Sequence, residues 1–294
     1  MESQESPERT PQETDVAPHA ASDVTPAVEP QPVEAPSFVY ALGQIDFRFP
    51  NLGLEKEFAQ VIGRGGEEAV SDRSALQTAI AQDQNRYLAR GLCWVLLIEG
   101  LEAYILVPRD PADYRLLIEA VREYPRRDDV DLVIGTIGPI APPEMCNGLA
   151  VRLVFFDQIY SFDRDSLVEM IPTPDTITDA DKPAFHTTAA GFFDRVMQMA
   201  DNAGATDEHR ALNYMAVRYP RIYATLAEEQ GRNTSLSAIE ARRSSVSGVR
   251  RIVDVILSFT HRQTDVTTKH FARIDVNDLH PFLMTPLSPY YDVQ

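Results

Sequence analysis

One segment, DNAGATDEHRALNYMAVRYP at residues 201–220, concentrates side chains that could recognise a ligand. A helix there would present two polar rows, because residues three or four apart share a face. One row combines a histidine with an amide, and the other combines two guanidinium groups with a phenol, a set that can bind a peptide carboxylate or backbone. The alternative is a capped helix that holds a neighbouring loop. The binding candidates on it are His209, Arg210, Asn213, Tyr214 and Arg218.

Cys146 and Asn147, in the loop IAPPEMCNG, complete the binding candidates. A nucleophilic cysteine needs a thiol pKa lowered by a histidine or a helix N-terminus, and no histidine is near in sequence. The alternative is an inert loop thiol. Cys93 falls in an apolar run, where we expect an inert core thiol. Two cysteines predict no disulfide framework and no metal cage, and they favour a reducing, cytoplasmic setting.

Motifs for other chemistry are absent from the sequence. It contains no CxxC, HExxH or GxSxG, and His261, His270 and His280 lack the spacing of metal ligands. Gly63-Arg64-Gly65-Gly66 lacks the Lys-Ser/Thr of a phosphate-binding loop. In GTIGPIAPP, Ile137 stands where a subtilisin-type serine would be, and an alkyl group cannot attack a carbonyl. We therefore predict no catalytic residue, no metal and no cofactor.

Charge and composition limit the partners. The net charge of −17 argues against a nucleic-acid binder that neutralises phosphates, although it does not exclude a local basic patch. Residues 1–37 are rich in Pro and Glu, which predicts a disordered tail, and they do not resemble a signal peptide. The longest apolar run is shorter than the roughly 20 residues of a membrane span, so we expect no membrane association.

The pattern of apolar residues predicts an α+β chain with two domains. Residues 38–172 should form a mixed sheet with helices, centred on a hairpin at residues 92–107. A polar, Pro-bearing linker is expected at residues 173–183. Residues 184–294 should place helices on an antiparallel sheet, because apolar residues alternate along residues 253–259 and 272–276. Caps are predicted at Ser71, Asp110, Asp163 and Thr206, and the C-terminal FLMTPLSPYYDVQ is expected to be irregular.

Long stretches of the chain resemble a known family. FVYALGQIDFRFPNLGLEKEFAQ, NRYLARGLCWVLLIEGLEAYILVPRDPADY, FDQIYSFD and LSPYYD, together with GPIAPPEMCNGL and the polar segment at residues 201–220, are similar to the C-terminal region of the cyanobactin maturation protease PatG family. The resemblance runs from Phe38 to the end. In that family a subtilisin-like domain cuts and macrocyclises a ribosomal precursor peptide, and a domain of unknown function ends the chain. No subtilisin motif is present here, so the resemblance implies no catalytic residue.

The resemblance and the missing nucleophile together favour a non-catalytic accessory protein. It would bind a precursor peptide or a subtilisin-like protease, for example by strand addition at an open sheet edge. Two alternatives stay open. One is an enzyme of unrecognised type that uses Cys146 or the His209 cluster, and the other is a structural module that forms a homodimer or larger oligomer.

Overall fold

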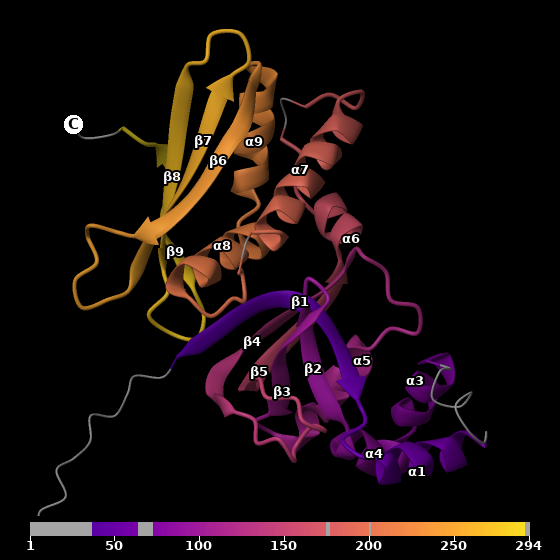
Figure 1. Cartoon of the computed structure of the whole chain (residues 1–294). Helices are drawn as coiled ribbons and strands as arrows, with labels where there is room; N and C mark the ends of the chain where they lie inside the picture. Colours follow the sequence, from indigo (N-terminus) through magenta and orange to yellow (C-terminus); the bar gives the residue numbers. More distant parts are fainter. Residues whose placement is uncertain (1–36, 64–72, 175–176, 200, 292–294) are drawn as a thin grey trace, which may run out of the picture. The chain divides into compact units, whose positions relative to one another are not determined.

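The computed structural model describes residues 37–63, 73–174, 177–199 and 201–291 (Figure 1). The predicted tail at residues 1–36 and the predicted cap at Ser71 lie outside these ranges. Helices and two separate sheets make the fold α+β, as predicted. Within the described ranges, no helix is both long enough and apolar enough to cross a membrane.

The first sheet closes into a five-stranded barrel in the order β1-β2-β3-β5-β4. The β3–β5 pair is parallel and the other pairs are antiparallel, so the predicted mixed sheet is confirmed, although its closure was not expected. The predicted hairpin is also confirmed, because Glu99 and Gly100 join β2 to β3 with positive φ angles, as a tight type I′ turn requires. The barrel strands are β1 (Phe38–Arg48), β2 (Cys93–Ile98), β3 (Leu101–Pro108), β4 (Asp129–Ile140) and β5 (Arg152–Asp163).

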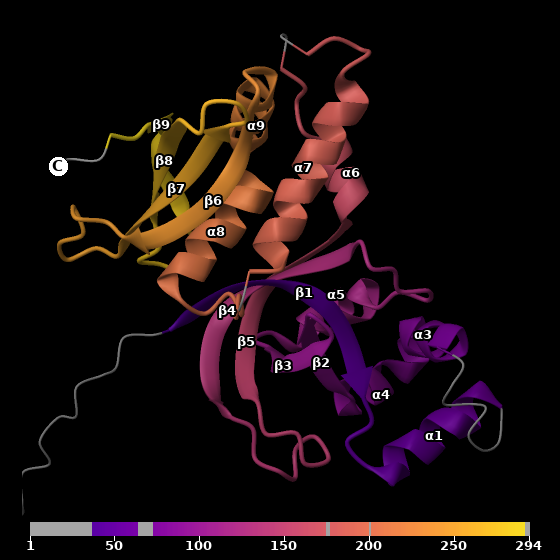
Figure 2. The ribbon, with the colours of Figure 1, turned by 45° about the horizontal axis from the view of Figure 1, so that its top comes forward.

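Short helices supply the rest of the barrel core (Figure 2). Their apolar residues Phe58, Ile80, Leu88 and Leu117 are buried together with Trp94 of β2. The predicted cap at Asp110 is confirmed, because its side chain accepts a hydrogen bond from the backbone N–H of Ala112. These elements are α1 (Leu52–Ile62), α3 (Arg73–Ala81), η1 (Asp83–Asn85), α4 (Arg86–Gly91), η2 (Pro111–Asp113) and α5 (Tyr114–Ala120).

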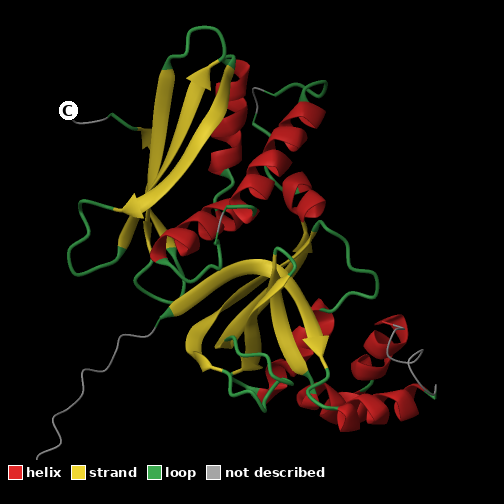
Figure 3. Cartoon of the chain, viewed as in Figure 1, coloured by secondary structure: helices red, strands yellow, loops and turns green. Residues whose placement is uncertain are grey.

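The second sheet is antiparallel, with the order β6-β7-β8-β9, and it packs against helices as predicted (Figure 3). Its core face carries the alternating residues Val253, Val255, Leu257 and Phe259, all nearly inaccessible to solvent. The helices are α6 (Arg164–Glu169), capped by Asp163 as predicted, α7 (Lys182–Met197), α8 (Asp207–Arg218) and α9 (Arg221–Gly231). The strands are β6 (Thr234–Arg243), β7 (Ile252–His261), β8 (Thr267–Asp275) and β9 (Phe282–Pro289).

The prediction of an irregular C-terminus is wrong for β9. Its residues pair with β8, for example Leu283 with Ile274 and Thr285 with Arg273. Pro286 and Pro289 do not prevent this pairing because β9 is an edge strand, where one side of the backbone needs no ladder partner.

One hydrophobic core joins the helices of the C-terminal half to the barrel. Tyr40 and Leu132 of the barrel belong to the same buried cluster as Phe193, Met215 and Val255. Residues 36–294 accordingly form one compact unit. The expected boundary at residues 173–183 stays a prediction.

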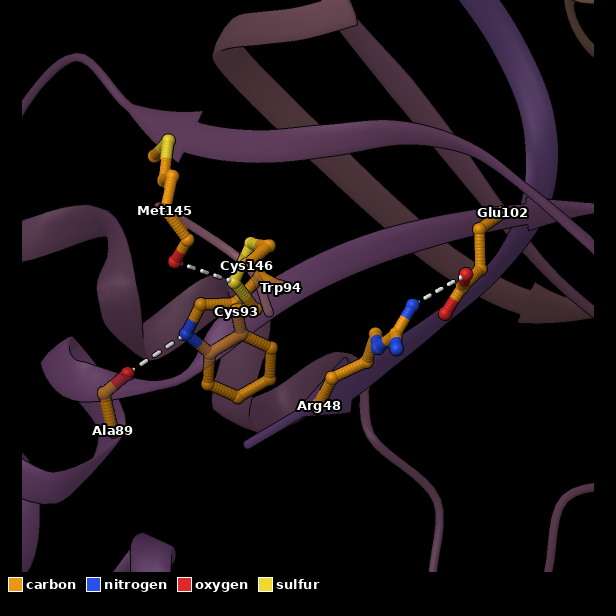
Figure 4. The surroundings of a disulfide bond; sticks show 7 residues. All are labelled: Arg48, Ala89, Cys93, Trp94, Glu102, Met145 and Cys146. Carbon is orange, nitrogen blue, oxygen red and sulfur yellow. Dashed lines mark hydrogen bonds and ion pairs between the residues drawn. A yellow bond between two sulfur atoms is a disulfide. The ribbon is translucent and has the colours of Figure 1, made fainter. Parts of the chain in front are cut away.

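Cys93 and Cys146 are joined by a disulfide, which corrects the prediction of two separate thiols (Figure 4). The loop after β4 folds back onto the outer surface of β2 and β3, where Cys146 is buried with Val95 and Ile105. The two Cα atoms lie 5.8 Å apart across a sequence separation of 53 residues, and such proximity cannot be read from sequence. The cytoplasmic setting was inferred from free thiols, so the disulfide removes that argument.

Candidate functional site

Helix α8 begins as the sequence predicted. The Thr206 hydroxyl accepts a hydrogen bond of 3.1 Å from the backbone N–H of His209, and Asp207 and Glu208 occupy the first turn. Acidic side chains at this end interact favourably with the helix dipole. The cap fixes which of the predicted binding residues face the protein and which face solvent.

Asn213 is fully buried and bonded within the chain. Its Nδ2 donates a hydrogen bond of 2.8 Å to the carbonyl of Tyr40, and its Oδ1 accepts one of 2.8 Å from Asn202. The backbone of Tyr40 also donates a bond of 2.9 Å to the carbonyl of Gly204. Asn213 therefore attaches strand β1 to the loop before α8.

Arg210 also binds the backbone of its own chain. Only 1% of its surface is exposed, and it donates hydrogen bonds to the carbonyls of Val276, Asp278 and Leu279. Its guanidinium lies 5.3 Å from the ring centroid of Phe38. Burial lowers the pKa of Arg210 to about 10, against 12.5 ordinarily. This side chain holds the end of β8 and is not accessible to a ligand.

The other three side chains of α8 reach the junction of the helix and the barrel. His209 is partly buried, its Nδ1 has no hydrogen-bond partner among the described residues, and desolvation lowers its pKa. Tyr214 packs edge-on against Tyr40. Arg218 is exposed, with its guanidinium 4.8 Å from the ring centroid of Tyr160. Of the predicted binding residues on α8, Arg210 and Asn213 are therefore buried and bonded within the chain, and Arg218 is exposed.

Cys146 cannot act as a thiol while it is bonded to Cys93, so the reactive-thiol hypothesis is wrong for this structure. The neighbouring Asn147 is exposed and adopts a φ of 49°, a left-handed conformation that Asn tolerates in turns. Among the described residues, no group of three His, Cys, Asp or Glu could hold a metal ion.

A different cluster, which we name the arginine face, occupies the surface of the second sheet opposite its helices. The strand register places Arg242, Asp254 and Arg273 side by side on β6, β7 and β8. Asp254 is 5% exposed and accepts a hydrogen bond of 3.0 Å from Nε of Arg273. The arginine face consists of Arg242, Asp254, Phe271, Arg273 and Tyr290.

These residues line a hollow of ≈ 520 Å³. Tyr290 extends over it, with its ring 5.5 Å from that of Phe271 and its hydroxyl 2.6 Å from Nη2 of Arg242. The guanidinium groups of Arg242 and Arg273 outnumber the one carboxylate, so these side chains give the hollow a positive charge in a chain of net charge −17. Such a site can attract an anion at short range.

Sequence reasoning missed the arginine face, although a signal was present. Residues 232–273 contain eight Lys and Arg but only three Asp and Glu, the reverse of the chain as a whole. The net charge of the whole chain conceals this local excess of basic residues. A window of local charge would have identified this stretch, but the alignment of Arg242 with Arg273 depends on the strand register.

Each edge of the second sheet is covered at some positions, which limits where the expected strand addition could occur. On β6, Arg195 donates hydrogen bonds of 2.9 and 3.0 Å to the carbonyls of Leu236 and Ser237. On β9, Pro286 lacks an N–H and the N–H of Leu287 donates to the Tyr219 hydroxyl. Prolines and covered backbone groups hinder edge-to-edge pairing at these positions, and strand addition elsewhere along the edges stays a prediction.

A second hollow, of ≈ 480 Å³, shares Pro289, Tyr290 and Tyr291 with the first. Its buried Glu229 is 3.2 Å from Nε2 of His270 and 2.6 Å from Nη1 of Arg232, and it accepts a bond from Thr234. Because both carboxylate oxygens have partners, this group fastens the end of α9 to the sheet.

Comparisons with known proteins concern the domain type and the fold. Residues 179–290, which include the arginine face, match the family model described as PatG C-terminal. A solved structure titled "PatG Domain of Unknown Function" covers 86% of this chain and 98% of its own, with a TM-score of 0.68 and 20% sequence identity, which shows a shared fold. A search of curated proteins finds no match.

Proposed function

We propose, because this chain contains a PatG C-terminal-type domain, that it is a non-catalytic accessory protein in the maturation of a ribosomal peptide related to the cyanobactins. It would bind a precursor peptide or a subtilisin-like maturation protease and bring the two together. The domain type supports the pathway, and the surface of the second sheet supports binding.

The observation that carries the binding role is the arginine face. Its charged and aromatic side chains surround an open hollow, and Arg and Tyr are enriched at protein interfaces. Arg242 is about half exposed, so its guanidinium is accessible to a partner. The thiol that could have served as a nucleophile is instead held in a disulfide.

Calorimetric titration tests this function. The purified chain is titrated with precursor peptides and with subtilisin-like proteases encoded beside it. We expect saturable binding of at least one of them, with a Kd in the micromolar range or tighter, and no turnover of the peptide by the chain alone. Heats equal to dilution for every candidate, or peptide cleavage by the pure chain, would contradict the function. Light scattering on the same sample would test the alternative of a homodimer or larger oligomer.

A further inference from the structure

We propose that the arginine face binds an acidic peptide segment, with carboxylates paired to Arg242 and Arg273 and with Tyr290 packed against the peptide. This inference rests on the proposed function and names the chemistry of the partner. Guanidinium groups bind carboxylates through paired, charge-assisted hydrogen bonds, which are stronger than neutral ones.

Asp254 fixes the position of the Arg273 guanidinium. The buried carboxylate takes the Nε–H of Arg273, and no described residue accepts a hydrogen bond from its Nη atoms. The guanidinium also lies 5.0 Å from the ring centroid of Phe271, which restricts its movement. An arginine fixed in this way loses less side-chain entropy on binding than a free one. Asp254 is therefore a positioning residue, and Arg273 is a contact residue.

Arg242 extends the positive surface. It is held by the Tyr290 hydroxyl, and its ion pair with Glu240 is long, at 3.4 Å, and solvent-exposed. Such pairs contribute little, so a ligand carboxylate can replace Glu240. The next residue, Arg243, pairs with Val253 of the core face and interacts with Asp207 of α8, so it belongs to the helix side of the sheet. Two arginines on neighbouring strand positions suit a segment that carries more than one carboxylate.

The aromatic side chains favour a peptide over a small anion. Tyr290 and Phe271 form an edge-on pair beside the arginines, and Tyr291 is 82% exposed at the rim of the hollow. Aromatic surface of this kind contributes through apolar contact with peptide side chains and backbone. The overall charge of −17 disfavours a long polyanion such as nucleic acid, whereas a short segment is screened from distant acids over about 8 Å at physiological salt.

Fluorescence anisotropy tests the inference with a labelled 12-residue peptide that carries four glutamates, its four-glutamine counterpart and a single-stranded DNA 12-mer. We expect the glutamate peptide to bind at least about tenfold more tightly than the other two. Arg242→Gln with Arg273→Gln should weaken it about tenfold or more. Arg115→Gln with Arg127→Gln makes the same charge change at exposed positions elsewhere and should alter the Kd less than about twofold.

A second variant distinguishes loss of binding from misfolding. It is needed because loss of Arg273 leaves Asp254 buried without its hydrogen-bond donor. Arg242→Gln alone keeps that pair and should still weaken binding severalfold. Equal affinity for the two peptides, tighter binding of DNA, or no effect of either variant would overturn the inference. If the acidic peptide fails while a precursor peptide or protease binds, the proposed function stands and this inference falls. If nothing binds, both fall.

Discussion

Asn213 of α8 donates a hydrogen bond of 2.8 Å to the backbone carbonyl of Tyr40, a residue 173 positions earlier in the chain. The same amide pairs reciprocally with Asn202, whose Nδ2 also donates 3.0 Å to the carbonyl of Val196. One buried side chain thus links the first barrel strand, the loop before α8 and the end of α7.

Replacement of Asn213 by Ala should destabilise the protein by about 1–3 kcal/mol. The Tyr40 carbonyl would stay buried without its Asn213 donor, and Asn202 would keep its bond to Val196 but lose its bonds to Asn213. A buried group left without a partner incurs the full desolvation cost. Urea unfolding followed by circular dichroism measures the change, with Gln60→Ala, which removes an exposed amide from helix α1, as the control. A loss for Asn213→Ala no larger than that of the control would show that the network is not structural.

Two glycines should respond to alanine in opposite directions. At Gly204 the φ is 68° and an added Cβ would lie 2.5 Å from the Cα of Ala41, so we expect Gly204→Ala to cost about 2 kcal/mol or more. At Gly191, inside α7, an added Cβ meets nothing within 4 Å, and Gly191→Ala should stabilise by about 0.5–1 kcal/mol. Thermal unfolding of both variants checks this, and shifts of the same sign would contradict it.

The disulfide should stabilise the barrel by about 2–4 kcal/mol, since it closes a long loop. Reduction of the wild type, or Cys93→Ala with Cys146→Ala, should lower the free energy of unfolding by this amount. The double variant should not respond to reductant. Thiol titration under denaturing, non-reducing conditions gives an independent check, because detection of two free thiols would show that the bond does not form.

His209 should make stability depend on pH. Its pKa in the folded state lies below 6.5, so the unfolded chain binds a proton more readily, and protonation favours unfolding. The penalty is absent well above pH 6.5 and grows as the pH falls through 6.5 toward the folded-state pKa. Wild type should therefore lose more stability than His209→Gln between pH 7.5 and 5.5 in chemical unfolding. Parallel losses would show that the histidine ionises normally.

Local features were predictable from sequence because their causes are local. The caps at Asp110, Asp163 and Thr206 follow from short side chains that accept bonds two or three residues ahead. Alternation along residues 253–259 identified β7 because one face of that strand is buried. The hairpin at residues 92–107 followed from Glu99-Gly100 between two apolar runs.

Features that depend on distant residues were not predictable. Closure of the barrel requires β1 to pair with both β2 and β4, and the disulfide requires a loop to fold back over β2. The sequence identified Arg210 as a side chain that could bind a carboxylate or a peptide backbone. In the structure it donates its hydrogen bonds to backbone carbonyls of its own chain. The arginine face arises from three strands in register, which no single segment reveals.

Arginine modification with mass spectrometry tests the binding role of the arginine face most directly. The protein is treated with phenylglyoxal in the presence and absence of the four-glutamate peptide. We predict that the bound peptide slows modification of Arg242 and Arg273 at least about fivefold, because paired guanidinium groups are shielded, while the exposed Arg115 reacts unchanged. Equal modification of all three arginines with and without saturating peptide would contradict the account.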